Sequence, residues 1–160
     1  MTDQLQRVAE TVHAALNALF EDTWPQPFAE ASRYPLFTGG KRVRPALCFA
    51  MHDAIRGPST WSAALINVAT SVELIHTYSL VHDDLPCLDN DDERRGRPTV
   101  HIAYDEGTAL LVGDALLTEA FALLARQTLP AETVVALVQD LSTASGHLGM
   151  IGGQAADIGL

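Results

Sequence analysis

The stretch that organises this chain reads Ser79-Leu80-Val81-His82-Asp83-Asp84-Leu85-Pro86-Cys87-Leu88-Asp89-Asn90-Asp91-Asp92-Glu93-Arg94-Arg95-Gly96-Arg97-Pro98-Thr99. It holds six of the chain's twenty acidic residues and three of its ten basic residues. Carboxylates packed this densely repel one another unless a hard cation such as Mg²⁺ neutralises them. The adjacent guanidinium groups suit phosphate oxygens. The stretch therefore predicts a magnesium–diphosphate site, and a solvated acidic loop is the alternative.

An apolar run leads directly into this acidic segment and predicts a helix over residues 61–84. Glu73 is its only charged residue before the acidic end, and a helix that is apolar nearly all round is typical of the middle of a bundle. His76, Ser79 and Asp83 fall on one face of this helix at i, i+3 and i+7. His76 is then either a hydrogen-bonded core histidine or part of the site.

A second informative stretch is Phe37-Thr38-Gly39-Gly40-Lys41-Arg42-Val43-Arg44-Pro45. Paired glycines let an anion approach the backbone N–H groups, and Pro45 suits the first turn of a helix expected over 46–55. The three bases before it sit where the helix dipole disfavours cations, which favours a bound anion. An ordinary glycine turn with solvated bases is the alternative.

The remaining pattern predicts one all-α domain over residues 1–160. No convincing period-two strand is present, and the apolar residues recur at helical spacing. Besides the two helices already described, we expect helices over 3–21, 27–34 (ended by Pro35), 107–126 and 131–158, the last one loosened by glycines.

Composition narrows the possible functions. The chain is 48% hydrophobic, enough to bury a core, and its net charge of −10 disfavours nucleic acid as a partner. No uninterrupted apolar run approaches the roughly 18 residues of a membrane span. The start lacks the features of a signal peptide, and Cys48 and Cys87 are too few for a disulfide framework. We therefore expect a cytoplasmic protein without a membrane span.

Four separated motifs resemble those of the trans-isoprenyl diphosphate synthases, the polyprenyl synthetase family, and most closely the N-terminal half of bacterial farnesyl and geranylgeranyl diphosphate synthases. They match in order and spacing over almost the whole chain. The motifs are Gly39-Gly40-Lys41-Arg42-Val43-Arg44-Pro45, the segment from His76 to Thr99, Gly113-Asp114-Ala115-Leu116-Leu117, and Gly152-Gly153-Gln154-Ala155. The resemblance implies an isoprenoid-synthase-type helical bundle.

The resemblance also implies roles for particular residues. Asp83, Asp84 and Asp89 match the catalytic aspartates that hold Mg²⁺ on an allylic diphosphate, and Arg94 matches an arginine that contacts this diphosphate. The residues that match the isopentenyl diphosphate site are Gly40, Lys41, Arg44, His76 and Arg95. The residues that match positions near the allylic substrate are Gln154 and Asp157, together with Tyr78 and Ser79 of the pocket that sets chain length.

The implied activity is condensation of isopentenyl diphosphate with an allylic geranyl or farnesyl diphosphate. Glu93 departs from the family's usual leucine. The family's second aspartate-rich motif would fall beyond Leu160, so about half of the family fold is covered, and a homodimer or a missing C-terminal half is expected. A non-catalytic homodimer that binds isoprenyl diphosphates or related phospholipids is one alternative. Another is an HD-type metal phosphohydrolase, suggested by His52-Asp53 and His82-Asp83.

Overall fold

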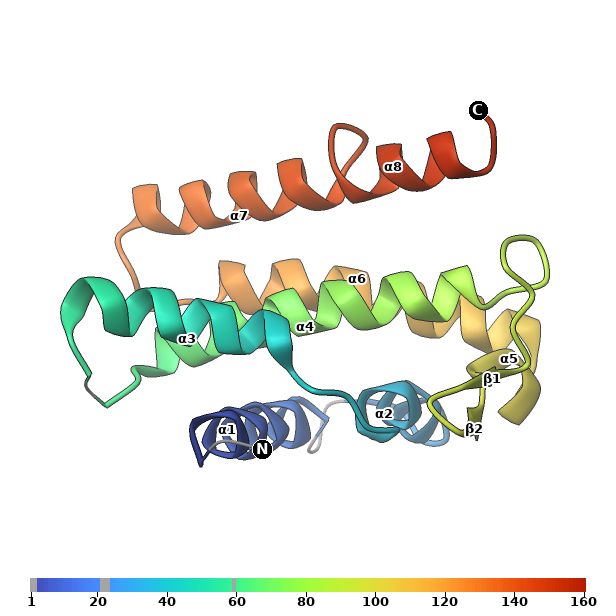
Figure 1. The fold of residues 1–160 in the computed structure, drawn as a ribbon, viewed down its shortest axis with the longest axis horizontal. Coiled ribbons are helices and arrows are strands. Elements are labelled where there is room, and N and C mark those ends of the chain that lie inside the picture. The colour runs from blue at the N-terminus through green and yellow to red at the C-terminus, as the bar shows by residue number, and fades with distance from the viewer. Residues whose placement is uncertain (1–2, 21–23, 59) are drawn as a thin grey trace.

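The computed structural model describes residues 3–20, 24–58 and 60–160. Within these residues the chain is almost entirely helical, which confirms the predicted all-α fold (Figure 1). The elements are α1 (Asp3–Leu19), α2 (Phe28–Phe37), α3 (Val43–Arg56), α4 (Ala63–Asp83), β1 (Glu93–Arg94), β2 (Arg97–Pro98), α5 (Val100–Ala103), α6 (Glu106–Ala125), α7 (Ala131–Ser145) and α8 (Met150–Asp157).

Helices α4 and α6 form the centre of the bundle and lie side by side (Figure 1). Helices α1 and α3 pack against α4, and α5 and α7 pack against α6. Leu74 of α4 and Leu116 of α6 are fully buried, and burial of one such side chain contributes about 1.5–3 kcal/mol. The central position of α4 is the one its apolar sequence predicted.

By length and composition alone, α4 and α6 are also apolar enough to cross a membrane. Their most apolar windows are 50% and 39% buried inside the bundle. A core helix satisfies the same criteria as a membrane span, so the two helices fit their place in the bundle without a membrane. The absence of a membrane span stays a prediction.

Two predicted helix boundaries are wrong. Pro35 does not end α2, which continues to Phe37, because a proline this close to the C-terminal end removes only one backbone hydrogen bond and the next residue, Leu36, is fully buried. The expected helix 131–158 is divided into α7 and α8. The chain turns at Gly146, where a Cβ atom would lie 2.6 Å from the carbonyl oxygen of Ser142, so the turn needs glycine.

The sequence pattern also missed a short antiparallel hairpin formed by β1 and β2. Its two-residue turn has positive φ at both positions, 56° at Arg95 and 76° at Gly96. Turns of this type match the twist of paired strands, and glycine adopts positive φ without steric cost. Strands of two residues are too short to produce an alternating pattern, but the hairpin decides where Arg94 and Arg95 lie.

Candidate functional site

The acidic segment folds back over the C-terminal end of α4. The N–H of Asp89 donates to the carbonyl of Asp83 (2.9 Å), and the N–H of Asp91 donates to the carbonyl of Asp84 (3.2 Å). These bonds satisfy carbonyl groups that a helix end leaves unpaired. The loop thereby adds carboxylates to the negative end of the helix dipole, an arrangement that a bound cation would stabilise.

The carboxylates of Asp83 and Asp89 lie close enough for their charges to interact. Burial raises the pKa of the Asp83 carboxyl group, and the charge of Asp89 raises it further. The side-chain amide of Gln154, on α8, donates to Asp83 Oδ1 at 2.6 Å, so the structure brings Gln154 next to one of the predicted aspartates.

The donor set of this pair suits Mg²⁺, although the three predicted ligands do not converge. Among residues 3–20, 24–58 and 60–160, no three His, Cys, Asp or Glu side chains are grouped to hold a metal ion. Mg²⁺ is commonly held by one or two carboxylates, with substrate phosphates and water completing its octahedron. Asp83 and Asp89 fit such a site, whereas Asp84 has another partner.

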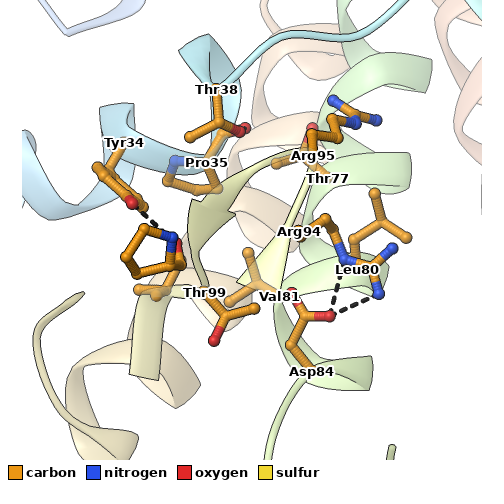
Figure 2. A pocket seen from close by; sticks show the side chains of 12 residues that line it. Tyr34, Pro35, Thr38, Thr77, Leu80, Val81, Asp84, Arg94, Arg95 and Thr99 are labelled. Atoms are coloured by element: carbon orange, nitrogen blue, oxygen red, sulfur yellow. Dashed lines mark hydrogen bonds and ion pairs between the residues drawn. The ribbon is translucent and has the colours of Figure 1, made fainter. Parts of the chain in front are cut away.

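That partner of Asp84 is Arg94 (Figure 2). Arg94 donates to Asp84 Oδ1 from Nε at 2.7 Å and from Nη2 at 2.5 Å, and Asp84 is only 3% exposed. Burial raises the pKa of the Asp84 carboxyl group, whereas the hydrogen bond from Arg94 lowers it. Asp84 therefore orients the Arg94 guanidinium group in this structure.

The hairpin that carries Arg94 and Arg95 is tied down on both sides. Tyr34 donates its hydroxyl hydrogen to the carbonyl of Pro98 (2.7 Å) (Figure 2). Thr99 donates its hydroxyl hydrogen to the carbonyl of Asp91 (2.8 Å). These bonds hold the hairpin between α2 and the acidic loop.

A cavity of about 620 Å³ lies between α4 and the loop of residues 38–42, which joins α2 to α3 and contains the paired glycines. The residues predicted from the resemblance to form the isopentenyl diphosphate site all line it, namely Gly40, Lys41, Arg44, His76 and Arg95. Arg95 donates to the carbonyl of Gly39, and its Nη1 atom would lie 2.5 Å from a Cβ atom on Gly40. Glycine at position 40 therefore makes room for the Arg95 guanidinium group. We call this space the cationic cavity.

Positive charge dominates the cationic cavity. Burial lowers the pKa of His76, and the nearby charge of Arg44 lowers it further. Burial also lowers the pKa of Arg95, and the charge of Arg42 adds to this effect. Cations placed close enough to disfavour one another suit a multiply charged anion, which relieves the repulsion.

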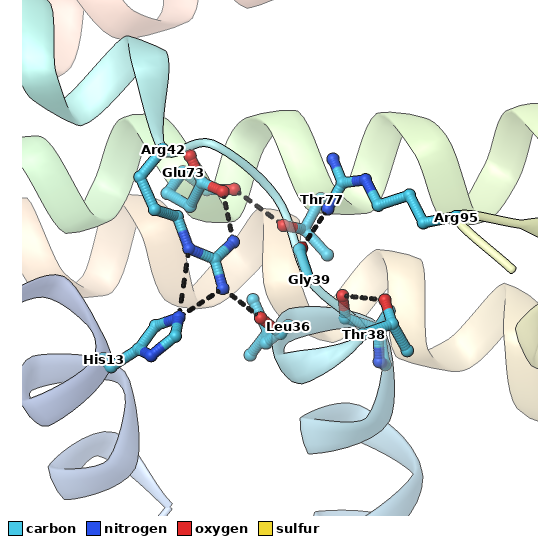
Figure 3. Close-up of polar contacts among 9 residues, drawn as sticks. His13, Leu36, Thr38, Gly39, Arg42, Glu73, Thr77 and Arg95 are labelled. Carbon is cyan, nitrogen blue, oxygen red and sulfur yellow. Dashed lines mark hydrogen bonds and ion pairs between the residues drawn. The ribbon is translucent and has the colours of Figure 1, made fainter. Parts of the chain in front are cut away.

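Arg42 differs from the neighbouring bases because it is buried (Figure 3). The sequence grouped it with Lys41 and Arg44 as part of an anion site, but its guanidinium group pairs with Glu73 (2.5 Å) inside the bundle. His13 contacts the same group. The sequence analysis did not predict these roles of His13 and Glu73. Glu73 could have indicated them, because a lone acid on an apolar helix requires a buried partner.

A second cavity, of about 490 Å³, lies between α4, α6 and α8 and is mainly apolar. Tyr78 and Ser79 line it, as predicted, and Asp83 and Gln154 lie at the same cavity. Its other lining residues are His82, Leu88, Asp114, Leu117, Met150, Ile151, Ala155 and Ile158. We call this space the tail cavity.

Asp157 is a predicted site residue for which the structure shows no contact with the rest of the site. It is exposed near the end of α8 and lines neither the cationic cavity nor the tail cavity. Gln154, one helical turn earlier, faces inward, so the spacing that joined the two residues does not bring both to the site.

The HD-type interpretation gains no support from the two His-Asp pairs. His52 contacts Asp53 near the end of α3, while His82 lies near the end of α4, and these helix ends point to opposite ends of the molecule (Figure 1). Over the described parts of the chain, no metal-ligand group of three such side chains forms at either pair.

The arrangement of carboxylates, arginines and cavities on an all-α bundle defines an isoprenoid-synthase-type protein. The family model described as polyprenyl synthetase matches residues 25–159. The chain belongs to the polyprenyl synthetase family.

Curated relatives carry synthase and transferase names. The heterodimeric geranylgeranyl pyrophosphate synthase large subunit 2 of Arabidopsis thaliana is 44% identical over 150 residues, covering 94% of this chain and 39% of the relative. A dimethylallyltranstransferase of Fischerella ambigua (strain UTEX 1903) is 42% identical over 160 residues, covering 99% of this chain and 45% of the relative.

Solved structures share the fold. The geranyltransferase from Legionella pneumophila is 42% identical with a TM-score of 0.89, covering 96% of this chain and 54% of that one. The FPP/GFPP synthase from Zymomonas mobilis is 42% identical with a TM-score of 0.83, covering 99% of this chain and 59% of that one. The chain spans less than half the length of the curated relatives named above and fits an N-terminal half of this fold.

Proposed function

We propose that this chain binds the diphosphate groups of isopentenyl diphosphate and of an allylic isoprenyl diphosphate, as part of a prenyl diphosphate synthase. The observation that carries the proposal is the position of Asp83 at the tail cavity, with Asp89 and Gln154 beside it. A carboxylate pair for a metal-bound diphosphate adjoining an apolar cavity fits a ligand with an anionic head and a hydrocarbon tail.

The cationic cavity is the proposed site of isopentenyl diphosphate. His76 lines the cationic cavity, and Asp83 lines the tail cavity. Asp83 follows His76 by seven positions on α4, a rise of about 10 Å along the helix axis. Two diphosphates bound at these positions would lie on the same helix. Lys41, Arg44 and Arg95 would neutralise the first diphosphate, and Arg94, oriented by Asp84, would contact the second.

In the proposed reaction the allylic carbon–oxygen bond breaks, and the double bond of isopentenyl diphosphate attacks the allylic carbon. The released pyrophosphate then takes the proton that the isopentenyl unit loses. Mg²⁺ bound at Asp83 and Asp89 would stabilise the charge of the leaving diphosphate. The chain's own residues bind both diphosphates, and Tyr78 and Leu117 of the tail cavity would shield the allylic tail from water.

Calorimetry with farnesyl thiodiphosphate tests this proposal. We expect binding that requires Mg²⁺, is lost in EDTA, and weakens by about 100-fold or more in Asp83→Ala, because removal of a charge-assisted ligand costs several kcal/mol. Asp140→Ala is the matched control, since Asp140 lies on α7 and lines neither cavity. Equal affinity in EDTA, or parent-like affinity of Asp83→Ala, would contradict the proposal.

A second candidate function is binding without condensation. It is favoured by the absence, among the described residues, of a second cluster of carboxylates at the tail cavity, where Asp114 of α6 is the one lining carboxylate besides Asp83. Departure of a diphosphate needs its charge neutralised from both sides. A radiolabelled condensation assay with isopentenyl and geranyl diphosphates separates the two candidates: turnover at about 1 per second or faster by this 160-residue chain alone supports synthesis, and binding without product supports the second.

A further inference from the structure

Arg42 is turned inward at the end of the loop before α3, whereas the bases close to it in the chain are exposed. It is 2% exposed, whereas Lys41 and Arg44 on either side are exposed to solvent. Its φ angle is 49°, a left-handed conformation that is uncommon for a residue with a Cβ atom and persists only where surrounding contacts hold it. The conformation of the loop at this position therefore depends on what the Arg42 side chain binds.

Three separate helices bind that side chain (Figure 3). Nη1 donates to Glu73 Oε1 of α4 at 2.5 Å, and Nη2 donates to the carbonyl of Leu36 of α2. Nη2 and Nε also approach His13 Nε2 of α1, at 2.9 and 3.3 Å. Only the planar fork of arginine presents donors in all these directions at once.

The same contacts connect the loop to the rest of the cationic cavity. Glu73 lies one helical turn before His76 on α4, and both residues line the cavity. At the other end of the loop, the carbonyl of Gly39 accepts a hydrogen bond from Arg95 of the hairpin. Arg42 thus fixes the loop against the helix that carries His76, and Arg95 fixes it against the hairpin.

We propose that Arg42 and Glu73 are positioning residues for diphosphate binding in the cationic cavity. They hold the loop and the first turn of α3 so that Lys41 and Arg44 face the same space as His76 and Arg95. Because the guanidinium charge of Arg42 is matched by Glu73, Arg42 sets the position of the binding cations without being one of them. The inference rests on the proposed function and adds the residues that set the geometry of its first diphosphate site.

Two variants separate positioning from stability. Arg42→Lys keeps the charge but loses the fork. The double variant Arg42→Met with Glu73→Leu replaces the buried ion pair by apolar side chains of similar volume, an exchange that often leaves stability unchanged or higher. Arg33→Lys is the control: Arg33 also bridges α2 to α1, through Asn17 at 2.5 Å, but lies outside the cationic cavity.

The experiment is calorimetry of each variant with isopentenyl diphosphate and, separately, with farnesyl thiodiphosphate and Mg²⁺, alongside its thermal unfolding. We expect both Arg42 variants to bind isopentenyl diphosphate at least about tenfold more weakly, since displacing a positioning group by about 1 Å costs that much or more. Affinity for farnesyl thiodiphosphate should change less than about twofold, and Arg33→Lys should resemble the parent for both ligands.

Parent-like affinity for isopentenyl diphosphate in a folded Arg42 variant would overturn the inference. Equal weakening of both ligands would also overturn it, because a general structural defect has that effect. If the double variant does not fold, Arg42→Lys decides the question. A parent chain that binds neither ligand would count against the proposed function instead.

Discussion

Tyr78 is the largest of the side chains that line the tail cavity. It is 5% exposed, lines the cavity, and packs edge-on against His82 with ring centroids 5.8 Å apart. We predict that Tyr78→Ala shifts binding preference from farnesyl towards geranylgeranyl thiodiphosphate by about tenfold, the effect of burying roughly two more methylene groups. Competition binding measures the ratio. An unchanged ratio would show that Tyr78 does not limit the tail, and Tyr104→Ala, outside the cavity, is the control.

His13 gives the fold a dependence on pH. Its pKa is lowered from 6.5 by burial and by the charge of Arg42, although Glu73 raises it. A histidine with a lower pKa in the folded state than in the unfolded state stabilises the folded state when pH is above the unfolded pKa. This stabilisation is lost as pH falls through the folded pKa. We therefore predict that the unfolding midpoint falls as pH is lowered below 6.5, because protonated His13 no longer accepts from Arg42.

Thermal unfolding between about pH 7 and pH 5 measures this effect, since histidine is the side chain whose unperturbed charge changes there. His13→Gln keeps a neutral acceptor and should lose part of the pH dependence, whereas His147→Gln, exposed at the turn between α7 and α8, should keep all of it. Identical pH profiles for the parent and His13→Gln would contradict the assignment.

At the scale of elements, the contact between α4 and α6 depends on a missing side chain. Gly113 of α6 faces the His82 ring, and a Cβ atom there would lie only 2.0 Å from His82 Nε2. His82 Nε2 also lies 3.0 Å from the carbonyl of Leu110, so the ring is held where it is. We predict that Gly113→Ala lowers the free energy of unfolding by about 1–3 kcal/mol through overpacking.

Gly153 provides the matched control for this prediction. It is also helical, but a Cβ atom there would meet nothing within 4 Å. Gly153→Ala should therefore raise the free energy of unfolding by up to about 1 kcal/mol, because alanine reduces the conformational freedom of the unfolded chain. Denaturant unfolding of both variants compares them directly, and equal effects would contradict the packing argument.

The long helices were predictable from the sequence because their apolar residues recur over many turns. Helix α4 was expected over 61–84 and spans Ala63–Asp83. Features decided by a few backbone angles were not predictable in this way. The hairpin depends on positive φ at Arg95 and Gly96, and the end of α7 depends on the close backbone approach at Gly146. Neither leaves a periodic pattern.

The same distinction holds for the site. The motifs grouped Lys41, His76 and Arg95, and the structure brings the three residues to one cavity. The sequence did not distinguish Arg42 from the neighbouring bases, because adjacent residues of one charge look alike until the fold turns one of them inward. Nor could spacing show that Asp84 pairs with Arg94, since the partner is brought back by the hairpin.

On the scale of the whole molecule, apolar side chains remain exposed on several helices. Leu111 of α6 is 58% exposed and Met51 of α3 is 61% exposed. Exposed apolar surface drives association, and a two-fold dimer is the commonest outcome. We predict a homodimer formed through α6, on which both Leu110 and Leu111 are exposed. Light scattering at micromolar concentration should show a dimer that Leu111→Lys converts to a monomer and Met51→Lys does not. A monomeric parent chain would contradict this prediction.

The central claim is that a metal-bound diphosphate binds at Asp83 and Asp89, at the tail cavity. Its most direct test is a crystal structure with Mn²⁺, an anomalous scatterer that prefers the same oxygen ligands as Mg²⁺, and farnesyl thiodiphosphate. We predict an anomalous peak in contact with Asp83 and Asp89, diphosphate oxygens on the same ion, and the hydrocarbon tail running towards Tyr78. A bound ligand with its diphosphate away from Asp83, or an ion held elsewhere on the chain, would contradict a metal–diphosphate site at these aspartates.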